Sequence, residues 1–418
     1  MKNSMKPDHR SRTISLHAAV LLLAWMPSIS LGETFPDTTE NIHLGLTFDY
    51  GMPKHDLTPL AGRVDYIWGA SPDFKGRAVP SMHHYMPFER DAKRDTLAWL
   101  QANHPDWIVY QADRKTVAWS FGSTHSVPID ITNPEVVAYQ LQEAAEFLAR
   151  PVADRTCPTG IAFDNLGFRN SWHRAGHFDR QGNWVPLFAG TGVAKDPLYE
   201  QAVAAWSQNV RQHFKEHFPG KTISINFTYQ PAVTEAPQRT LMDNADFILW
   251  EGGFSWGGSK ALESRFITDA KWQDRVQWLE SLNQQGKPFF IVNEVKAAGH
   301  DAITPAQVQW VLANYLLVKG AHSYMSIYPY DPVADKQFYG GFNDRPEYHA
   351  AIGHAVSPRQ TFQNAQRRDY SNGLVLVNPS GTNTVAVTLP RPYADLYGKT
   401  FTQITLEPAS GVVLLNRK

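Results

Sequence analysis

The stretch that decides the fold is Gly160-Ile161-Ala162-Phe163-Asp164-Asn165, a short apolar run that ends in a carboxylate and an amide. A buried parallel strand has this continuous apolar character because both of its faces are covered. The pattern recurs at Phe247-Ile248-Leu249-Trp250-Glu251 and at Phe289-Phe290-Ile291-Val292-Asn293-Glu294. Each carboxylate could cap a following helix or pair with an arginine. Their shared position at strand ends, where barrel enzymes place their reactive groups, instead indicates acid/base chemistry.

Strand and helix patterns alternate over residues 62–350, which predicts a (β/α)8 TIM barrel. The segment Asn133-Pro134-Glu135 has the residues typical of a helix start. Residues 42–50 are an additional strand candidate that would shift the strand numbering by one. The predicted strands span residues 64–68, 82–86, 107–110, 161–163, 222–227, 247–250, 289–292 and 322–327, and the predicted helices span 91–102, 133–149, 197–218, 272–284 and 304–319.

Two further segments stand apart from this alternation. Residues 166–196 form a long insertion rich in Gly, Trp, His and Asn, and they directly follow the Asp164 strand. We therefore expect them to cover the mouth of the barrel and to contribute to the substrate site. Short strands at 373–378, 384–389 and 412–415 have no helix between them, which predicts a small C-terminal antiparallel β-sandwich. The expected domains are the barrel over 33–356 and the sandwich over 357–418.

The composition of the chain indicates which kinds of binding partner to expect. The net charge of −1 argues against a nucleic-acid partner. Aromatic residues make up 12% of the chain, which suits a sugar-binding cleft as well as a large core. Residues 1–32 combine a basic start, a short apolar run and small residues, as in a secretory signal peptide, although an uncleaved anchor is an alternative. We expect a secreted or periplasmic protein with no membrane partner after cleavage, and the oligomeric state is open.

Asp164 and Glu251 are the favoured catalytic pair, since glycoside hydrolysis needs two carboxyl groups that flank the scissile bond. Glu294 is a third candidate, because in other barrel glycosidases the nucleophile follows strand seven. Retaining and inverting mechanisms are both open. Polar and aromatic residues at strand ends or in the insertion are candidates to bind a carbohydrate substrate: Asn165, Trp68, His84, Tyr85, Asp113, Trp172, Trp184, Asn226 and Tyr328.

Two other functions compete with a glycosidase. Gly253-Phe254-Ser255-Trp256-Gly257 matches the G-x-S-x-G motif of serine esterases, but two glycines separate Ser255 from the preceding strand and a poor helix start follows it. A non-catalytic carbohydrate-binding barrel is the second alternative. We expect no metal, because the adjacent His83 and His84 would point to opposite faces of a strand and no HExxH or paired CxxC motif is present. We expect no nucleotide cofactor, because neither a Gly-Lys-Ser/Thr segment nor a third Gly follows Gly190-Thr191-Gly192.

The chain resembles secreted bacterial barrels described as hypothetical glycoside hydrolases, which are remotely similar to α-galactosidase-like and amylase-like enzymes. In α-galactosidase-like barrels the nucleophile follows strand four and the acid/base follows strand six. The resemblance therefore implies Asp164 as nucleophile and Glu251 as acid/base, although those relatives often have Asp at both positions. It rests on Asp65–Gly69, Gly160–Asn165, Gly182–Val185, Trp250–Phe254, Gly373–Asn378 and Asp395–Gly398.

Overall fold

The computed structural model describes the chain from residue 42 to residue 417 with several gaps. The described residues are 42–48, 62–70, 79–91, 95–119, 124–149, 159–188, 190, 196–227, 235–256, 265–334, 336–337 and 342–417. The predicted signal segment 1–32 lies outside them. None of the helices in these ranges is both long enough and apolar enough to cross a membrane.

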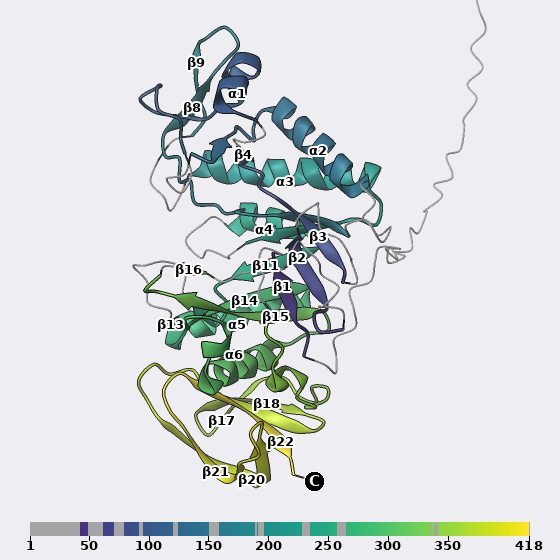
Figure 1. The fold of residues 1–418 in the computed structure, drawn as a ribbon, viewed down its shortest axis with the longest axis vertical. Coiled ribbons are helices and arrows are strands. Elements are labelled where there is room, and N and C mark those ends of the chain that lie inside the picture. The colour runs from purple at the N-terminus through teal and green to yellow at the C-terminus, as the bar shows by residue number, and fades with distance from the viewer. Residues whose placement is uncertain are drawn as a thin grey trace, which may run out of the picture. The chain divides into compact units, whose positions relative to one another are not determined.

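Eight parallel strands form the barrel (Figure 1). A parallel bridge between Leu44 and Met325 joins the last strand to the first. Most of the strands are apolar because one face of each lies inside the barrel and the other lies under helices. The predicted (β/α)8 barrel is therefore confirmed. In sheet order the strands are β1 (Gly45–Thr47), β2 (Tyr66–Ala70), β3 (Ser81–Tyr85), β7 (Gly160–Phe163), β10 (Thr222–Asn226), β11 (Phe247–Glu251), β14 (Phe289–Lys296) and β15 (Ser323–Asp331).

The strand prediction was wrong at two places. The first adds one barrel strand and the second removes one, so the numbers of the later strands do not change. The additional candidate at 42–50 supplies the first barrel strand, β1. Residues 107–110 do not enter the barrel; they run from the end of η3 (Pro105–Trp107) to the start of β5 (Tyr110–Gln111), and Trp107, Ile108 and Tyr110 pack in a separate apolar cluster. This run is apolar because it is buried in that cluster, and an apolar run does not reveal which sheet buries it. Asp164 and Glu251 therefore still follow the fourth and sixth barrel strands.

Alternation along the strands separates the barrel interior from the layer under the helices. Ala162 and Leu249 belong to the interior cluster, whereas Ile161, Phe163 and Ile248 pack in the outer cluster. Because side chains alternate between the two faces, a residue two positions beyond an interior residue also faces inward. This rule places Asp164 and Glu251 above the interior core, at the C-terminal mouth of the barrel.

Helices cover the outer face of the described barrel strands, and several begin with side-chain caps. Asp196 accepts hydrogen bonds from the backbone of α3, and Thr304 forms a capping box with Gln307 in α6. The polar helix α4 was not predicted, and the predicted helix over 91–102 is a shorter helix, α1 (Leu97–Asn103). The covering helices are α2 (Pro134–Ala149), α3 (Pro197–His217), α4 (Glu235–Asn244), α5 (Asp269–Gln284) and α6 (Pro305–Val318).

Two insertions extend from the ends of neighbouring barrel strands. One follows β3 and contains β4 (Glu89–Asp91), β5 and β6 (Ser126–Pro128); the other follows β7 and contains β8 (Ala175–Phe178) and β9 (Trp184–Pro186). β5, β8 and β9 pair as one antiparallel sheet, so the two insertions fold together. Figure 1 shows β8 and β9 beside α1, beyond the helices α2 and α3.

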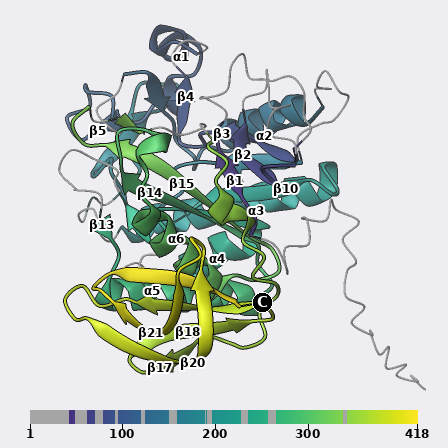
Figure 2. The same cartoon turned by 60° about the horizontal axis from the view of Figure 1, so that its bottom comes forward.

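The C-terminal module is antiparallel, as predicted, and its six strands pair as one sheet in the order β17-β18-β19-β22-β20-β21 (Figure 2). Apolar side chains from five of these strands form a single cluster. The sequence prediction missed three strands, of which β18 has a largely polar sequence. The strands are β17 (Gln360–Phe362), β18 (Ala365–Tyr370), β19 (Gly373–Asn378), β20 (Val385–Asp395), β21 (Thr400–Leu406) and β22 (Ser410–Asn416).

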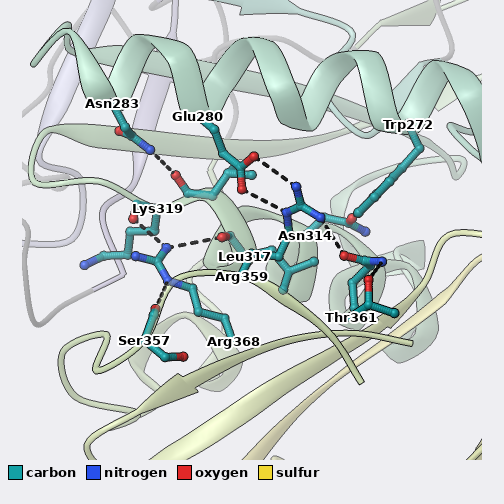
Figure 3. Close-up of polar contacts among 12 residues, drawn as sticks. Trp272, Glu280, Asn283, Asn314, Leu317, Lys319, Ser357, Arg359, Thr361 and Arg368 are labelled. Atoms are coloured by element: carbon teal, nitrogen blue, oxygen red, sulfur yellow. Dashed lines mark hydrogen bonds and ion pairs between the residues drawn. The ribbon is translucent and has the colours of Figure 1, made fainter. Parts of the chain in front are cut away.

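Polar contacts attach this sheet to the barrel helices (Figure 3). Arg359 forms a two-pronged ion pair with Glu280 of α5, at 2.8 and 2.9 Å. Arg368 donates to the carbonyl groups of Leu316, Leu317 and Lys319 at distances of 3.1, 3.2 and 2.7 Å. The last carbonyls of a helix have no partner within the helix. Arg368 therefore stabilises the C-terminal end of α6 from the neighbouring sheet.

Candidate active site

A row of polar residues crosses the mouth of the barrel on four adjacent strands. His84 is on β3, Asp164 follows β7, Asn226 ends β10 and Glu251 ends β11. These strands are consecutive neighbours in the sheet. Each residue lies two positions beyond an inward-facing residue of its own strand, so the four side chains converge at the mouth. The sequence prediction named all four residues, and the structure brings them into one hydrogen-bonded chain.

Asp164 is 8% exposed and accepts three hydrogen bonds. Its Oδ2 lies 3.0 Å from Nε2 of His84, while its Oδ1 accepts from the backbone N–H of Asn165 at 2.7 Å and from Nδ2 of Asn226 at 2.8 Å. Burial alone would raise the pKa of Asp164, but the hydrogen bond and charge of His84 and the two amide donors outweigh it. The pKa of Asp164 therefore lies below its usual value, and the carboxylate is ionised at neutral pH.

Asn226 connects the two candidate carboxylates. Its Nδ2 donates to Asp164 Oδ1 at 2.8 Å and to Glu251 Oε2 at 3.0 Å. Because both oxygens accept from one nitrogen, their separation is less than about 6 Å. Retaining glycosidases hold their carboxyl groups ~5–5.5 Å apart and inverting ones ~6.5–9.5 Å apart. The separation of this one pair of oxygens, Oδ1 of Asp164 and Oε2 of Glu251, lies nearer the shorter class.

The turn after Glu251 is fixed by contacts that sequence analysis missed. Arg275 of α5 donates to the carbonyl groups of Gly252 and Gly253, and its guanidinium lies 5.0 Å from the ring centroid of Trp250. Burial lowers the pKa of Arg275 to about 10, so it stays charged at neutral pH. Gly252 has φ +82°, and a Cβ there would lie 2.6 Å from the ring of Trp256. Only Gly fits this turn without strain.

A cleft of about 260 Å³ opens beside the two carboxylates. Asp164, Asn226 and Glu251 line it, together with Asn165, whose φ of 55° is left-handed, a conformation that Asn tolerates better than most residues. The first part of the insertion borders the cleft, since residues of 166–172 line it. Trp172 lines the cleft but is buried against Phe88, Phe188 and Tyr199. Sequence analysis missed Glu89 and Arg169, which also line it.

Six residues predicted to contact substrate do not line this cleft, and one of them, His84, is joined to it only through its contact with Asp164. Trp68 and Tyr328 are buried in the barrel interior, where Trp68 Nε1 donates to Ser224 Oγ at 2.6 Å and the Tyr328 hydroxyl accepts from the backbone N–H of Thr47 at 2.6 Å. The prediction that Trp68 and Tyr328 contact substrate was wrong, because inward-facing aromatic residues below the mouth fill the barrel.

The other three lie farther from the barrel interior. Tyr85 faces outward and donates to Glu143 of α2 at 2.7 Å. Asp113 is exposed and accepts from the backbone of its own turn, at Lys115 and Thr116. Trp184 packs against Phe178 in the β5-β8-β9 sheet. A residue at the end of a predicted strand therefore lines the cleft only where the strand belongs to the barrel and the side chain faces inward.

Glu294 and Ser255 are both fully buried and do not line the cleft. The Ser255 hydroxyl donates to the backbone carbonyl of Glu294, which holds the turn after Glu251 against β14. A serine nucleophile must be exposed beside a general base. The hydroxyl of Ser255 is buried and already donates a hydrogen bond to a backbone carbonyl, which contradicts the esterase interpretation.

His83 and His84 point to opposite faces, as expected, with the ring of His83 lying 3.8 Å from that of Phe147 on α2. Within the described ranges, no group of three or more His, Cys, Asp or Glu residues could hold a metal ion.

No protein-family model matches the sequence, and no curated protein is similar to it. Similar solved structures include the glycoside hydrolase domain of PelA from Pseudomonas aeruginosa, at 15% identity over 71% of this chain and 98% of that chain, with a TM-score of 0.41. The maltogenic α-amylase AmyB from Thermotoga neapolitana is 10% identical over 91% and 97% of the two chains, with a TM-score of 0.46. A cyclic α-maltosyl-(1→6)-maltose hydrolase from Arthrobacter globiformis is 11% identical over 86% and 87%, with a TM-score of 0.46.

These three neighbours are glycoside hydrolases. At this identity and TM-score they say nothing about individual residues. The roles given to site residues below rest on the geometry of this chain.

Proposed function

We propose that the protein is a retaining glycoside hydrolase that acts on a poly- or oligosaccharide. The observation that carries this proposal is the single amide of Asn226 that donates to both Asp164 and Glu251. It supports a carboxyl separation in the range of retaining enzymes. The cleft beside the pair gives a sugar access to both groups.

In the first step, Asp164 attacks the anomeric carbon while Glu251 donates its proton to the leaving glycosidic oxygen. The carbon–oxygen bond to the leaving group breaks as the bond to Asp164 forms. The low pKa of Asp164 supports its role as the ionised nucleophile. Two nearby carboxyl groups repel each other when both are charged, which favours a proton on the second carboxyl, Glu251.

In the second step, Glu251 takes a proton from a water molecule that attacks the same anomeric carbon. The ester to Asp164 breaks, and both carboxyl groups return to their starting states with net retention of configuration. Asn226 and the backbone N–H of Asn165 keep Oδ1 of Asp164 in place through both steps. Oδ2, which the described residues contact only through His84, is the oxygen best placed to attack.

Secretion is part of the proposal and rests on the signal-like segment 1–32. The alternative of a non-catalytic carbohydrate-binding barrel predicts binding without cleavage. An activity screen of the full chain against a polysaccharide panel separates the two. We expect cleavage by the wild-type chain, release of the retained anomer by ¹H NMR, and loss of cleavage in Asp164→Asn. Binding of oligosaccharides with no cleavage of any panel member would support the alternative, and cleavage by Asp164→Asn at the wild-type rate would contradict the assignment.

A further inference from the structure

His84 is held in a fixed orientation beside the candidate nucleophile. Its ring centroid lies 5.0 Å from that of Phe48, at an angle of 79°, and 6.3 Å from that of Trp68. Gly69 has φ +74°, and a Cβ there would lie 2.8 Å from the Phe48 ring and 3.6 Å from the His84 ring. Gly69 therefore allows the two rings to approach each other, and the resulting contacts aim Nε2 of His84 at Asp164.

The hydrogen bonds that Asp164 accepts favour the ionised form of its carboxyl group. Oδ1 accepts from Asn165 and Asn226, and Oδ2 faces Nε2 of His84. Because a carboxyl group that accepts several hydrogen bonds is favoured in its ionised form, Nε2 of His84 is the donor in this contact. The imidazole can fill that role as the neutral Nε2–H tautomer or as the imidazolium.

The orientation of Asn226 follows from the same requirement. Its carbonyl oxygen would repel an ionised Asp164, so the NH₂ end faces both carboxyl groups. One hydrogen goes to Asp164 Oδ1 and the other to Glu251 Oε2. Since Oε2 accepts a hydrogen bond, a proton on Glu251 belongs on the other oxygen, Oε1.

We infer that His84 is a positioning residue: through Nε2 it keeps Asp164 ionised, so that the one proton shared by the two carboxyl groups resides on Glu251. That the proton on Glu251 serves catalysis rests on the proposed function. That the proton is on Glu251 and not on Asp164 does not. Several charged groups surround the chain of four residues. Glu89 on β4 and Arg169 line the same cleft, Arg275 of α5 supports the turn after Glu251, and Glu294 lies on the next strand, β14.

Carbodiimide labelling of the full chain tests the inference without a substrate. A carbodiimide with glycinamide converts protonated carboxyl groups to amides, and peptide mass spectrometry measures the yield at each position. At pH 6 we expect at least about tenfold more labelling at Glu251 than at Asp164, since one pKa unit changes the protonated fraction tenfold. Equal labelling of the two residues in the wild-type chain would overturn the inference.

Variants of His84 identify the cause of the difference. His84→Leu removes the donor to Oδ2, and the shorter amide of His84→Asn should not reach it, so we expect Asp164 labelling to rise about tenfold in each. His84→Gln keeps an amide donor of similar reach and should stay within about threefold of wild type. His83→Leu is the matched control, because His83 is adjacent but packs on Phe147 at the opposite face.

Thermal melts of all variants verify that they are folded at the labelling temperature. If His84→Leu melts too early, the polar His84→Asn variant carries the test. An Asp164 yield unchanged from wild type in the folded variant would overturn the role of His84. Failure of the polysaccharide screen with the labelling pattern intact would remove only the proposed function.

Discussion

Nε2 of His84 lies 3.0 Å from Oδ2 of Asp164, although the two residues are 80 positions apart in the chain. They are neighbours because β3 and β7 pair in parallel, with His84 beside Ala162 in register. The intervening chain forms α1, α2 and part of the antiparallel sheet outside the barrel. The pair is therefore a product of the barrel topology, and it gives the nucleophile a partner on the adjacent strand.

Replacing Asp164 should change how stability depends on pH. Its pKa in the folded chain is below 3.8, so its ionised form contributes stability above that pH and loses it as the pH falls through the folded value. We expect wild type to exceed Asp164→Asn in free energy of unfolding at pH 7, with the difference shrinking below about pH 4. Urea unfolding of both proteins between pH 3 and pH 7 measures this difference in the free energy of unfolding. A difference that grows as the pH falls would contradict the low pKa of Asp164.

Replacing Glu251 should affect substrates according to their leaving groups. Glu251→Gln cannot donate a proton, so cleavage of a natural glycoside should fall by ~10²–10⁴-fold. A dinitrophenyl glycoside of the same sugar needs no proton and should form the glycosyl ester at a nearly unchanged rate. Single-turnover release of dinitrophenol measures this step.

Glu294→Gln is the control on the next strand, β14, where Glu294 lies two positions beyond Val292, the register partner of Glu251. Because Glu294 is buried and does not line the cleft, we expect any loss of activity to follow loss of folded protein. A folded but inactive Glu294→Gln beside a fully active Glu251→Gln would move the acid/base role to β14.

Asn226→Asp should be the most harmful conservative change at the site. It keeps the shape of the side chain but replaces the donor between two carboxyl groups with a third acidic group. Either the three carboxyl groups repel one another or a second proton must bind. We expect a loss of kcat of at least ~10²-fold, since two catalytic groups lose their fixed orientation. Ser224→Ala, on the same strand and also inward-facing, should retain most activity, and equal losses in the two variants would contradict a specific role for Asn226.

Arg275→Met should destabilise the turn that carries Glu251. Two buried carbonyl groups, those of Gly252 and Gly253, would lose a charged donor. A cost of about 1–3 kcal/mol in the free energy of unfolding is expected. Arg275→Lys retains a charge but not the planar guanidinium that lies over the Trp250 ring, so it should recover only part of the loss. Chemical unfolding measures both, and a wild-type free energy in Arg275→Met would show that the turn is held by β14 alone.

The sequence predicted the barrel and the four polar residues at its mouth because each signal was local. An apolar run that ends on Asp164 or Glu251 is visible without any knowledge of the fold. The role of Arg275 could not be predicted, since it reaches the turn from a helix that begins 18 positions after Glu251. Trp68 and Tyr328 were misassigned because sequence spacing does not show the depth of a residue along the barrel axis.

Helix α6 is buried along its length from Val308 to Val318, and Gln309 accepts a hydrogen bond from the backbone of Val413 in β22. A surface helix of a barrel normally keeps a polar face towards water. Here the C-terminal sheet replaces that water on the outer face of α6, so we expect the two modules to unfold as one cooperative unit. We expect a single calorimetric transition for the full chain, and a chain that stops at residue 356 should aggregate because the apolar outer face of α6 would be exposed.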